Sequence, residues 1–304
     1  MTTLSILVPT YFHEAYLDSC VTSALSAKLA PHHRIEVLIL DDGSTDGTPD
    51  VGKRLQRQHG DSVTYVWQEN TGHIPRNLNT LAKLASGDLL MLFAGDDAFP
   101  EGWDASARIA HFEDDPELAL SLCQGQVLNA NGNLQDELRQ PSDVMDALTR
   151  LPSTQILDEF LERQPFQLFL QAAIVRRDVY RDVGGYNETL AADDTAMALR
   201  LFRTMVAEGL THRVDEDISF LYRKHSGNLH RNHLRALHTK IQFYVSEIAP
   251  EHRPRFAKKL LFNLEGLSWR VLWSHAVREM LHGALEPKLV HRLLIKASLR
   301  KIKR

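Results

Sequence analysis

The most informative segment of the sequence is GDLLMLFAGDDAFPEGW, residues Gly87–Trp103. It contains a short apolar run, Leu89–Phe93, between turn-forming residues, which is typical of a strand buried on both faces. The run stops at Gly95, and two carboxylates, Asp96 and Asp97, follow directly. Because ligands of open α/β sheets bind outside the carboxyl ends of the strands, the sequence predicts a site here. Carboxylates on such a loop suit Mg²⁺ or Mn²⁺, although an Asp-rich turn that caps a helix would look the same.

The residues before this stretch alternate between apolar runs and helix-like segments. Strands are expected at Leu4–Val8, Ile35–Leu40 and Val63–Trp67, and helices at Glu14–Leu29, Pro49–His59 and Pro75–Ala85. This βαβαβαβ order predicts an α/β protein with a doubly wound, mostly parallel sheet flanked by helices. Neither GxGxxG nor GxxxxGK[ST] follows the first strand, which argues against a dinucleotide site or a P-loop.

Acidic residues instead follow two of these strands, at Asp41-Asp42 and at Asp96-Asp97. Carboxylates repel phosphate unless a cation lies between them. The pattern therefore favours a nucleotide diphosphate that is held through a divalent metal.

Composition places few further limits on the protein. The chain has 304 residues, 43% of them hydrophobic and 24% charged, as expected of one large or two smaller globular domains. A net charge of −4 gives no indication of nucleic-acid binding. The two cysteines do not form a disulfide framework. Because we find neither a signal peptide nor an apolar run of about 18 residues, we expect a cytoplasmic protein.

Several short motifs occur in one order along the chain. The first group is Val8–Tyr11, Leu40–Thr48, Asn70–Gly72, Arg76-Asn77, Ala85–Asp88 and Gly95–Asp97. The second group is Ala173–Arg177, Val183–Glu188, Asp193-Asp194, Tyr222-Arg223 and His225–Asn228. In this order and spacing they resemble glycosyltransferase family 2, whose members have the GT-A fold.

The resemblance implies an enzyme that transfers a sugar, with inversion, from a nucleotide-diphosphate sugar to a hydroxyl of a saccharide, lipid-linked or protein acceptor. It implies nucleotide-binding roles for Pro9, Thr10, Tyr11, Glu14, Asp41, Asp42, Asn70, Arg76 and Asp96. A divalent cation, Mg²⁺ or Mn²⁺, is expected on Asp96, Asp97 and His225. Asp194, with Asp193 beside it, is the expected general base. Polysaccharide, glycolipid or glycoconjugate assembly is the expected setting.

Each of these assignments has a simpler alternative. Asp193-Asp194 could be a helix N-cap, His225 could belong to an ordinary polar loop, and Arg76 could be structural. The chain also departs from the family pattern at Ala94, which replaces the first acid of the DXD motif, at Phe12-His13, where Asn-Arg is usual, and at Asp193, where Glu is usual. A nucleotide-sugar-binding module without catalysis is therefore the main rival function. A nucleotidyltransferase is a weaker rival, since it would need a Gly-rich basic loop after the first strand.

The motifs divide the chain into three parts. Residues 1–125 are the expected donor half, 126–228 the acceptor half, and 229–304 a helical C-terminal region. Beyond Glu286 the chain is basic, with Lys288, Arg292, Lys296, Arg300 and Arg304 at every fourth position and Val290, Leu294, Ala297 and Ile302 largely opposite. Such a helix can lie on an anionic membrane surface. A peripheral contact with the inner face of the membrane is one hypothesis, and a solvated, frayed terminus is the other.

Overall fold

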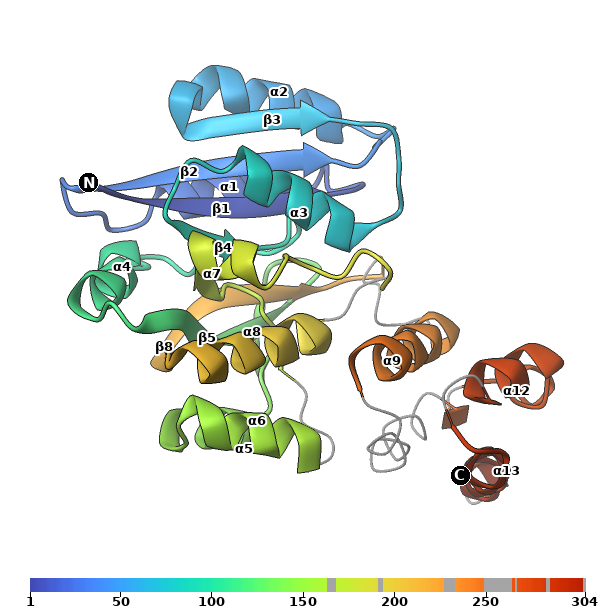
Figure 1. Ribbon diagram of the computed structural model, residues 1–304. Helices are drawn as coiled ribbons and strands as arrows, with labels where there is room; N and C mark the ends of the chain where they lie inside the picture. Colours follow the sequence, from blue (N-terminus) through green and yellow to red (C-terminus); the bar gives the residue numbers. More distant parts are fainter. Residues whose placement is uncertain are drawn as a thin grey trace.

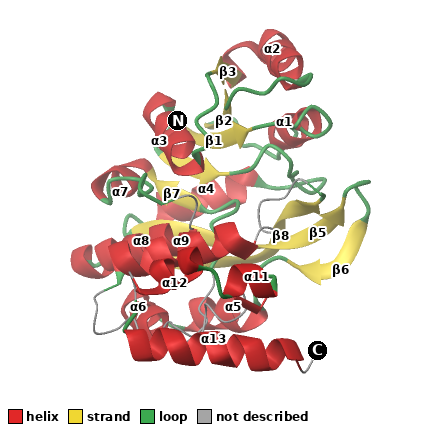
Figure 2. Ribbon diagram, turned by 90° about the vertical axis from the view of Figure 1, so that its right-hand side faces the viewer, coloured by secondary structure: helices red, strands yellow, loops and turns green. Residues whose placement is uncertain are grey.

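The computed structural model describes residues 1–162, 168–190, 194–226, 233–248, 264–265, 267–282 and 285–302. Its centre is an eight-stranded sheet with helices on both faces (Figures 1 and 2). The strands are β1 Thr2–Thr10, β2 His33–Asp41, β3 Val63–Trp67, β4 Leu89–Leu92, β5 Leu118–Asn129, β6 Leu134–Leu138, β7 Ile174–Arg176 and β8 Thr211–Lys224. The helices up to the end of β8 are α1 Leu17–Leu25, α2 Thr48–His59, α3 Ile74–Leu84, α4 Ala105–Asp114, α5 Ser142–Arg150, α6 Ser153–Glu162, α7 Arg177–Asp182 and α8 Asp194–Glu208.

The first half of the sheet is parallel and has the order β3-β2-β1-β4. Thr10 pairs with Asp41 across β1 and β2, and Leu7 pairs with Leu92 across β1 and β4. The carboxyl ends of these strands therefore meet at one edge of the sheet, where the acidic loops lie. The expected strands and helices of this half are confirmed, with ends that differ by a few residues. The first helix begins at Leu17 rather than Glu14, because residues 11–16 form a turn held by β2's loop.

The second half of the sheet is mixed. β7 runs antiparallel between β4 and β5, β6 is antiparallel to β5, and β8 is parallel to β5. A turn at Asn131-Gly132 joins β5 to β6, with Gly132 at a φ of 84°. The boundary expected near residue 125 lies within β5, so one continuous sheet joins the two halves.

Two apolar cores lie on opposite faces of this sheet. One core packs the sheet against α1, α2 and α4, through side chains such as Val21, Leu55 and Ile109. The other packs it against α3, α5, α7 and α8. This three-layer arrangement explains why β1 and β2 are almost wholly buried, as the unbroken apolar runs predicted.

Glu36 fastens the amino edge of the sheet, opposite the acidic loops. Its buried carboxylate accepts hydrogen bonds from Ser5 Oγ, from N and Oγ of Ser86, and from Gly87 N. Burial alone would raise the pKa of Glu36, but these donors outweigh it and hold the pKa below its ordinary value. The network ties β1 and β2 to the turn that begins β4. Gly87 is needed there, since a Cβ would stand 2.5 Å from the Thr3 carbonyl oxygen.

The C-terminal region is helical, as expected. Its elements are α9 His233–Glu247, α11 Trp269–Leu272, α12 His275–His282 and α13 Pro287–Ile302. The apolar side of α13 packs inward, with Val290, Leu293, Leu294 and Ala297 buried. Arg300 pairs with Glu265 at 3.0 Å, and Arg304 lies outside the described residues. Among the described helices, none combines the length and apolar character that a membrane span requires.

Candidate active site

The loop after β4 places Asp96 at the carboxyl edge of the sheet. Its Oδ2 lies 2.9 Å from Nε2 of His225, which follows β8, and 4.0 Å from Nε2 of His13, which follows β1. A backbone bridge between Ala98 and Leu221 holds the β4 loop against β8. Residues that are far apart in the sequence thus meet at one carboxylate oxygen. The structure brings together two of the three expected metal ligands, Asp96 and His225.

Asp97 is oriented differently. Its Oδ1 accepts a hydrogen bond from Arg223 N at 2.7 Å, and its Oδ2 accepts one from the Gln171 side chain. Only 1% of Asp97 is exposed. Both oxygens thus hold neighbouring segments in place, and the third expected metal ligand has a supporting position behind the loop.

The pKa values of the two adjacent carboxylates, Asp96 and Asp97, are shifted in opposite directions. Burial, and after it the charge of Asp96, raise the pKa of Asp97 well above its usual range. Burial acts on Asp96 in the same direction, but the hydrogen bond with His225 and the nearby His13 outweigh it and lower the pKa of Asp96. Burial lowers the pKa of His13 itself. Asp96 is therefore the anionic member of the pair.

Asp41 and Asp42, at the carboxyl end of β2, organise the loops around them. Asp41 accepts hydrogen bonds from Ser44 N at 2.9 Å and from the Tyr65 hydroxyl at 2.8 Å. Asp42 accepts hydrogen bonds from the side chains of Gln68 and Thr71 and from two backbone N–H groups, those of Thr71 and Gly72. These donors outweigh burial, so the pKa of Asp42 is lowered. Both carboxylates are buried. They fix the shape of the neighbouring loops, and Asp42 does so by holding the loop after β3.

The turn after β1 is fixed by the loop after β2. Phe12 has a φ of 56°, a region that non-glycine residues rarely occupy. Its N–H donates to Ser44 Oγ, and the N–H of His13 donates to Thr48 Oγ1, each at 2.9 Å. Glu14 accepts a hydrogen bond from Gly47 N. Of the residues expected at the nucleotide, Pro9 and Thr10 end β1 and Tyr11 begins this turn, with Thr10 buried and Tyr11 exposed.

Asn70 and Arg76 flank the same edge from the β3 side. Asn70 packs so closely on Gly43 that a Cβ on that glycine would meet its backbone nitrogen at 2.6 Å. Arg76 lies in the first turn of α3, and its Nε is 3.5 Å from a carboxylate oxygen of Glu188. This pair is half exposed and therefore adds little to stability. The pair joins α3 to the loop that follows α7.

Asp194 is the first residue of α8. Its Oδ1 accepts a hydrogen bond from the Tyr186 hydroxyl at 3.0 Å, and its Oδ2 accepts one from Leu170 N at 3.1 Å. Gln171, the next residue, donates to Asp97. Two adjacent residues, Leu170 and Gln171, therefore link the expected base to the acidic loop. The other base candidate, Asp193, lies outside the described residues.

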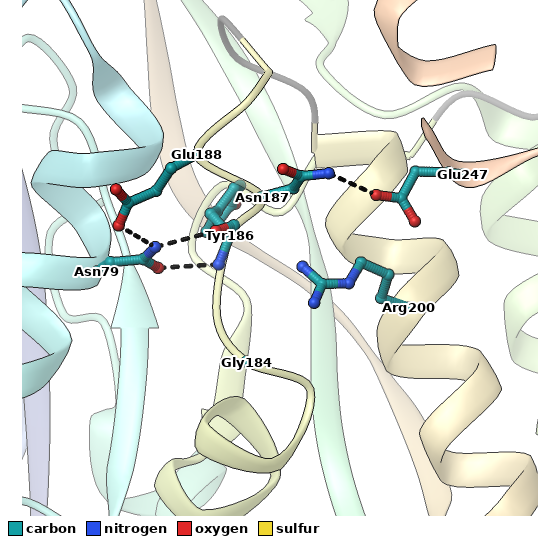
Figure 3. Close-up of a pocket in the computed structure, with 7 residues that line it drawn as sticks. All are labelled: Asn79, Gly184, Tyr186, Asn187, Glu188, Arg200 and Glu247. Atoms are coloured by element: carbon teal, nitrogen blue, oxygen red, sulfur yellow. Dashed lines mark hydrogen bonds between the residues drawn. The ribbon is translucent and has the colours of Figure 1, made fainter. Parts of the chain in front are cut away.

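A polar pocket of about 530 Å³ has in its lining Tyr186, the residue whose hydroxyl donates to Asp194 (Figure 3). Its lining residues are Asn79, Gly184, Tyr186, Asn187, Glu188, Arg200 and Glu247. The Asn79 amide bonds both backbone groups of Tyr186 and the Glu188 carboxylate. This cross-link fixes Tyr186, whose hydroxyl reaches Asp194.

Three residues at the site were not predicted to have a role there. They are His13, which stands out in the sequence only as a departure from the family pattern, Gln171, and Arg139 of the β5–β6 hairpin. Arg139 Cζ lies 3.4 Å from the centre of the Phe169 ring and 4.3 Å from that of Tyr222. Its Nε is buried without a hydrogen-bond partner among the described residues. Arg139 interacts electrostatically with both Asp97 and Asp194, a relation that sequence spacing could not reveal.

A separate group of possible metal ligands lies at the other end of the sheet. His32, His33 and Glu113 place one ligand atom each within 4.8 Å of one another. His33 begins β2, whereas Asp41 ends it, so this group is remote from Asp96. His33 is satisfied without a metal, because Ser106 Oγ and Glu113 are within hydrogen-bond distance of its two ring nitrogens.

Residues 5–184 match the family model described as Glycosyl transferase family 2. The chain belongs to this family. A 101-residue segment is 33% identical to "Dolichyl N-acetyl-alpha-D-glucosaminyl phosphate 3-beta-D-2,3-diacetamido-2,3-dideoxy-beta-D-glucuronosyltransferase" of Methanococcus voltae and covers 33% of this chain and 31% of that protein. A 125-residue segment is 35% identical to "Validoxylamine A glucosyltransferase" of Streptomyces hygroscopicus subsp. limoneus and covers 40% of this chain and 27% of that protein. The matches thus span less than a third of these relatives.

Two solved structures share the GT-A fold over nearly the whole chain. Residues 1-349 of S. aureus TarS in complex with UDP-GlcNAc superpose with a TM-score of 0.60 at 17% identity, covering 100% of this chain and 89% of that one. The mannosyltransferase PcManGT from Pyrobaculum calidifontis, in complex with GDP-Man and Mn²⁺, gives a TM-score of 0.61 at 17% identity, covering 98% and 86%. At these identities the likeness shows the fold alone, and it confirms the predicted architecture.

Proposed function

We propose that the protein transfers a sugar from a nucleotide-diphosphate sugar to an acceptor hydroxyl, with inversion and with the help of a divalent metal. One observation carries the proposal. Leu170 N donates to Asp194, and the side chain of Gln171 donates to Asp97, the residue after Asp96. Segment 170–171 therefore links Asp194 to the loop that carries the Asp96–His225 pair. Sugar transfer of this kind requires a carboxylate that binds the metal, here Asp96, and a carboxylate that acts as the base, here Asp194.

The residues present fit a divalent cation. Asp96 supplies an anionic oxygen and His225 an imidazole nitrogen that already meets it at 2.9 Å. When bound, the cation would stabilise the negative charge that grows on the departing nucleoside diphosphate. Asp97 would position the loop, because both of its oxygens are bonded to protein donors. The proposed cation is Mg²⁺ or Mn²⁺.

The loops around Asp41 and Asp42 would hold the nucleoside. Their carboxylates are rigid, since each accepts hydrogen bonds from more than one donor. Tyr11 is 45% exposed beside this loop and offers a ring face for a base. Arg76 stands at the same edge, where its guanidinium could neutralise phosphate.

Asp194 would act as the general base. The acceptor hydroxyl attacks the anomeric carbon from the face opposite the leaving group, which inverts the configuration, and its proton passes to a carboxylate oxygen of Asp194. The Tyr186 hydroxyl and Leu170 N hold that carboxylate in one orientation. Asp193 remains the other base candidate.

The named relatives support the substrate class without fixing it. TarS was solved with UDP-GlcNAc and PcManGT with GDP-Man and Mn²⁺, and the Methanococcus relative is named for a dolichyl-phosphate-linked sugar acceptor. We therefore propose a nucleotide-sugar donor and a saccharide, lipid-linked or protein acceptor. The proposed setting is cytoplasmic assembly of a polysaccharide, glycolipid or glycoconjugate.

A thermal-shift panel tests the donor site. UDP, GDP, dTDP and CMP are each added with and without Mn²⁺, since a ligand that binds only the folded state raises the melting temperature. We expect a manganese-dependent shift with one nucleoside diphosphate, which is lost in Asp96→Ala and kept in Glu101→Gln, an exposed acid on the same loop. The absence of any shift from the folded wild-type protein would contradict the proposal.

A binding module without catalysis is the rival that Ala94 favours, because one carboxylate of the usual motif is missing. Nucleotide binding alone does not separate the two functions. Turnover with a panel of nucleotide sugars does, with the anomeric configuration of the product read by NMR. An inverted product supports the enzyme, and manganese-dependent binding without any hydrolysis or transfer supports the module.

We also propose that α13 lies on an anionic membrane surface, through the face that the fold leaves exposed. The apolar half of the helix is packed inward, so it is not the contact face. The outer face carries Ile295 and Leu299, which are 41% and 54% exposed, among basic side chains. Trp273 lies beside this face, with its Nε1 bonded to Ser298 Oγ at 3.1 Å. Exposed aromatic, aliphatic and basic groups together suit the headgroup region.

Co-sedimentation with vesicles tests this contact. We expect binding to vesicles that contain phosphatidylglycerol and little binding to pure phosphatidylcholine. The double variant Ile295→Asp, Leu299→Asp should lose it, whereas Leu134→Asp on the exposed β6 strand should keep it. Equal binding by both variants would contradict the proposal. Point variants are preferable to truncation at Glu286, since truncation would uncover the core beneath α13.

A further inference from the structure

His32, His33 and Glu113 place three possible metal ligands together at the amino edge of the sheet. One ligand atom from each lies within 4.8 Å of the other two. Nε2 of His33 is 3.2 Å from Oε2 of Glu113, and Nε2 of His32 is 3.8 Å from the same oxygen. At about 3.3 Å per residue, strand β2 separates His33 from Asp41 at its other end by about 26 Å. The cluster is therefore distinct from the site around Asp96.

A tight turn brings the two imidazoles to one carboxylate. The Ala30 carbonyl accepts a hydrogen bond from His33 N at 2.9 Å, which closes a β-turn with Pro31 at its second position. His32 and His33 take the third and fourth positions, and their ring centres lie 4.1 Å apart. In an extended strand two successive side chains would point to opposite faces. The turn is thus what allows both rings to reach Glu113.

Helix α4 supplies both the carboxylate and a support for His33. Ser106 and Glu113 are two turns apart on this helix, so their side chains share one face. Ser106 Oγ lies 2.7 Å from Nδ1 of His33 and accepts a hydrogen bond from Ala30 N. A hydrogen bond at Nδ1 is the usual support of a histidine that binds a metal through Nε2, because it fixes the tautomer and the ring orientation.

Glu113 has one oxygen directed at the histidines. Its other oxygen, Oε1, accepts a hydrogen bond from the Thr2 hydroxyl. The hydrogen bonds from Thr2 and then from His33 lower the pKa of Glu113, so the group is a carboxylate at neutral pH. Only 3% of the His33 side chain is exposed, against 65% for His32 and 35% for Glu113. The cluster therefore has one fixed inner ligand and two outer ligands that solvent, and a cation, can reach.

The separations suit a tetrahedral ion. Ligand atoms that each lie about 2.0–2.2 Å from zinc are about 3.3–3.6 Å apart in a tetrahedron. The separations from Glu113 Oε2, 3.2 and 3.8 Å, fall just either side of this range. Without a metal, Glu113 and His33 share a proton at this place, and a cation would replace it. The exposed side chain of His32 has the freedom to complete the coordination.

We infer that His32, His33 and Glu113 form a second metal site, which takes Zn²⁺. Two imidazoles and a carboxylate are zinc ligands and leave a fourth position for water, whereas Mg²⁺ prefers oxygen ligands alone. The bound ion would tie the start of β2 to the end of α4. Its role would be in stability, remote from sugar transfer, and the inference does not depend on the proposed function.

Calorimetric titration of Zn²⁺ into the metal-free full-length protein, without an affinity tag and without nucleotide, tests the inference. We expect binding that an excess of Mg²⁺ does not displace. At a free Zn²⁺ concentration about a hundred times Kd, the melting temperature should rise by about 4 °C. Glu113→Gln keeps a hydrogen-bond acceptor for His33 but removes the charge, and His32→Ala removes an exposed ligand. Each should weaken Zn²⁺ binding at least tenfold.

Two further variants are the controls. Asp114→Asn changes the next acid of α4, which is exposed, and should bind Zn²⁺ as the wild type does. Asp96→Asn changes the other proposed metal site and should also keep this binding. Melting temperatures without metal show that each variant is folded.

Three results would overturn the inference. The first is wild-type protein that binds no Zn²⁺. The second is equal Zn²⁺ affinity in the wild type and in folded Glu113→Gln and His32→Ala. The third is a loss of binding in Asp96→Asn with Glu113→Gln unchanged, which would place the ion at the carboxyl edge instead. Because the readouts are Zn²⁺ affinity and melting temperature, the first two results leave the proposed sugar transfer untouched.

Discussion

The two edges of the central sheet use buried carboxylates in opposite ways. At the amino edge, Glu36 is surrounded by hydroxyl and backbone donors that are all directed at it. At the carboxyl edge, Asp96 faces two imidazoles, and polar atoms of Thr10 and His13 have no hydrogen-bond partner among the described residues. Saturated hydrogen bonding stabilises the fold, whereas buried polar atoms without a protein partner and a strained turn are typical of functional sites.

The largest effect should come from the base. Asp194→Asn keeps the size of the side chain and an oxygen for the Tyr186 hydroxyl but removes the ability to accept the proton. We expect turnover to fall by about 10²–10⁴-fold, while the manganese-dependent thermal shift with nucleotide stays within about 1 °C of wild type. Initial rates of sugar transfer and the thermal-shift panel measure the two quantities. Turnover near the wild-type rate would remove Asp194 as the base and leave Asp193.

The amino edge should respond in the opposite sense. Glu36→Gln removes the charge that four donor groups surround, and we expect a loss of about 2–3 kcal/mol in the free energy of unfolding at pH 7, with nucleotide binding unchanged. Because the pKa of folded Glu36 lies below 4.5, its contribution is present above that pH and is lost as the pH falls through the folded pKa. The difference between variant and wild type should therefore shrink below about pH 4.5.

Urea titrations at several pH values measure this prediction. Glu101→Gln is the control, since Glu101 is exposed and should leave the free energy of unfolding unchanged at every pH. A Glu36→Gln deficit that is the same at pH 7 and at acid pH would show that the charge is not what the donors stabilise.

The sequence predicted the strands and the position of the acidic loop at the carboxyl edge of the sheet. The apolar runs that end in acid predicted β1 to β4, because a buried parallel strand leaves a continuous apolar signal. The same signal located Asp96 at the carboxyl edge. The opposite orientations of Asp96 and Asp97 could not be predicted, since they depend on Arg223 N and Gln171, which arrive from distant segments.

The position of His13 and the packed side of α13 also depend on contacts between distant segments, which the sequence does not reveal. Three strands lie between His13 and Asp96 in the sequence, but β1 and β4 are neighbours in the sheet, so the loops that follow them meet. The basic spacing of the last helix predicted a charged face, but periodicity does not say which side is packed. The structure places Val290 and Leu294 against protein and Ile295 and Leu299 outside.

The adjacent carboxylates give a finer test within the carboxyl edge. Asp96→Asn should weaken Mn²⁺ binding in the presence of UDP or GDP at least tenfold, because it removes the anionic oxygen between the histidines. Asp97→Asn should change it by less than about threefold, since Gln171 can turn its amide to pair with the new one. Calorimetric titration measures both variants. Equal losses would mean that Asp97 also meets the cation.

The smallest effect concerns the strained turn. Phe12 occupies left-handed backbone space at a φ of 56°, where a residue with a Cβ pays about 1–2 kcal/mol and Asn is better tolerated. The Phe12 ring is 46% exposed and makes an edge contact with Tyr11 at 4.3 Å between ring centres, which offsets part of that strain. We therefore expect Phe12→Asn to stabilise the fold by about 0.5–1 kcal/mol and Phe12→Ala to give no such gain.

Chemical denaturation of the two variants separates strain from ring packing, because both remove the ring and only Asn suits the left-handed region. Phe12→Asn should keep the backbone turn and therefore leave Mn²⁺ affinity within about twofold of wild type. A destabilised Phe12→Asn would show that the Tyr11 contact outweighs the strain at this position. The carboxyl edge would then resemble the amino edge more than its backbone suggests, with packing rather than function maintaining an unfavourable conformation.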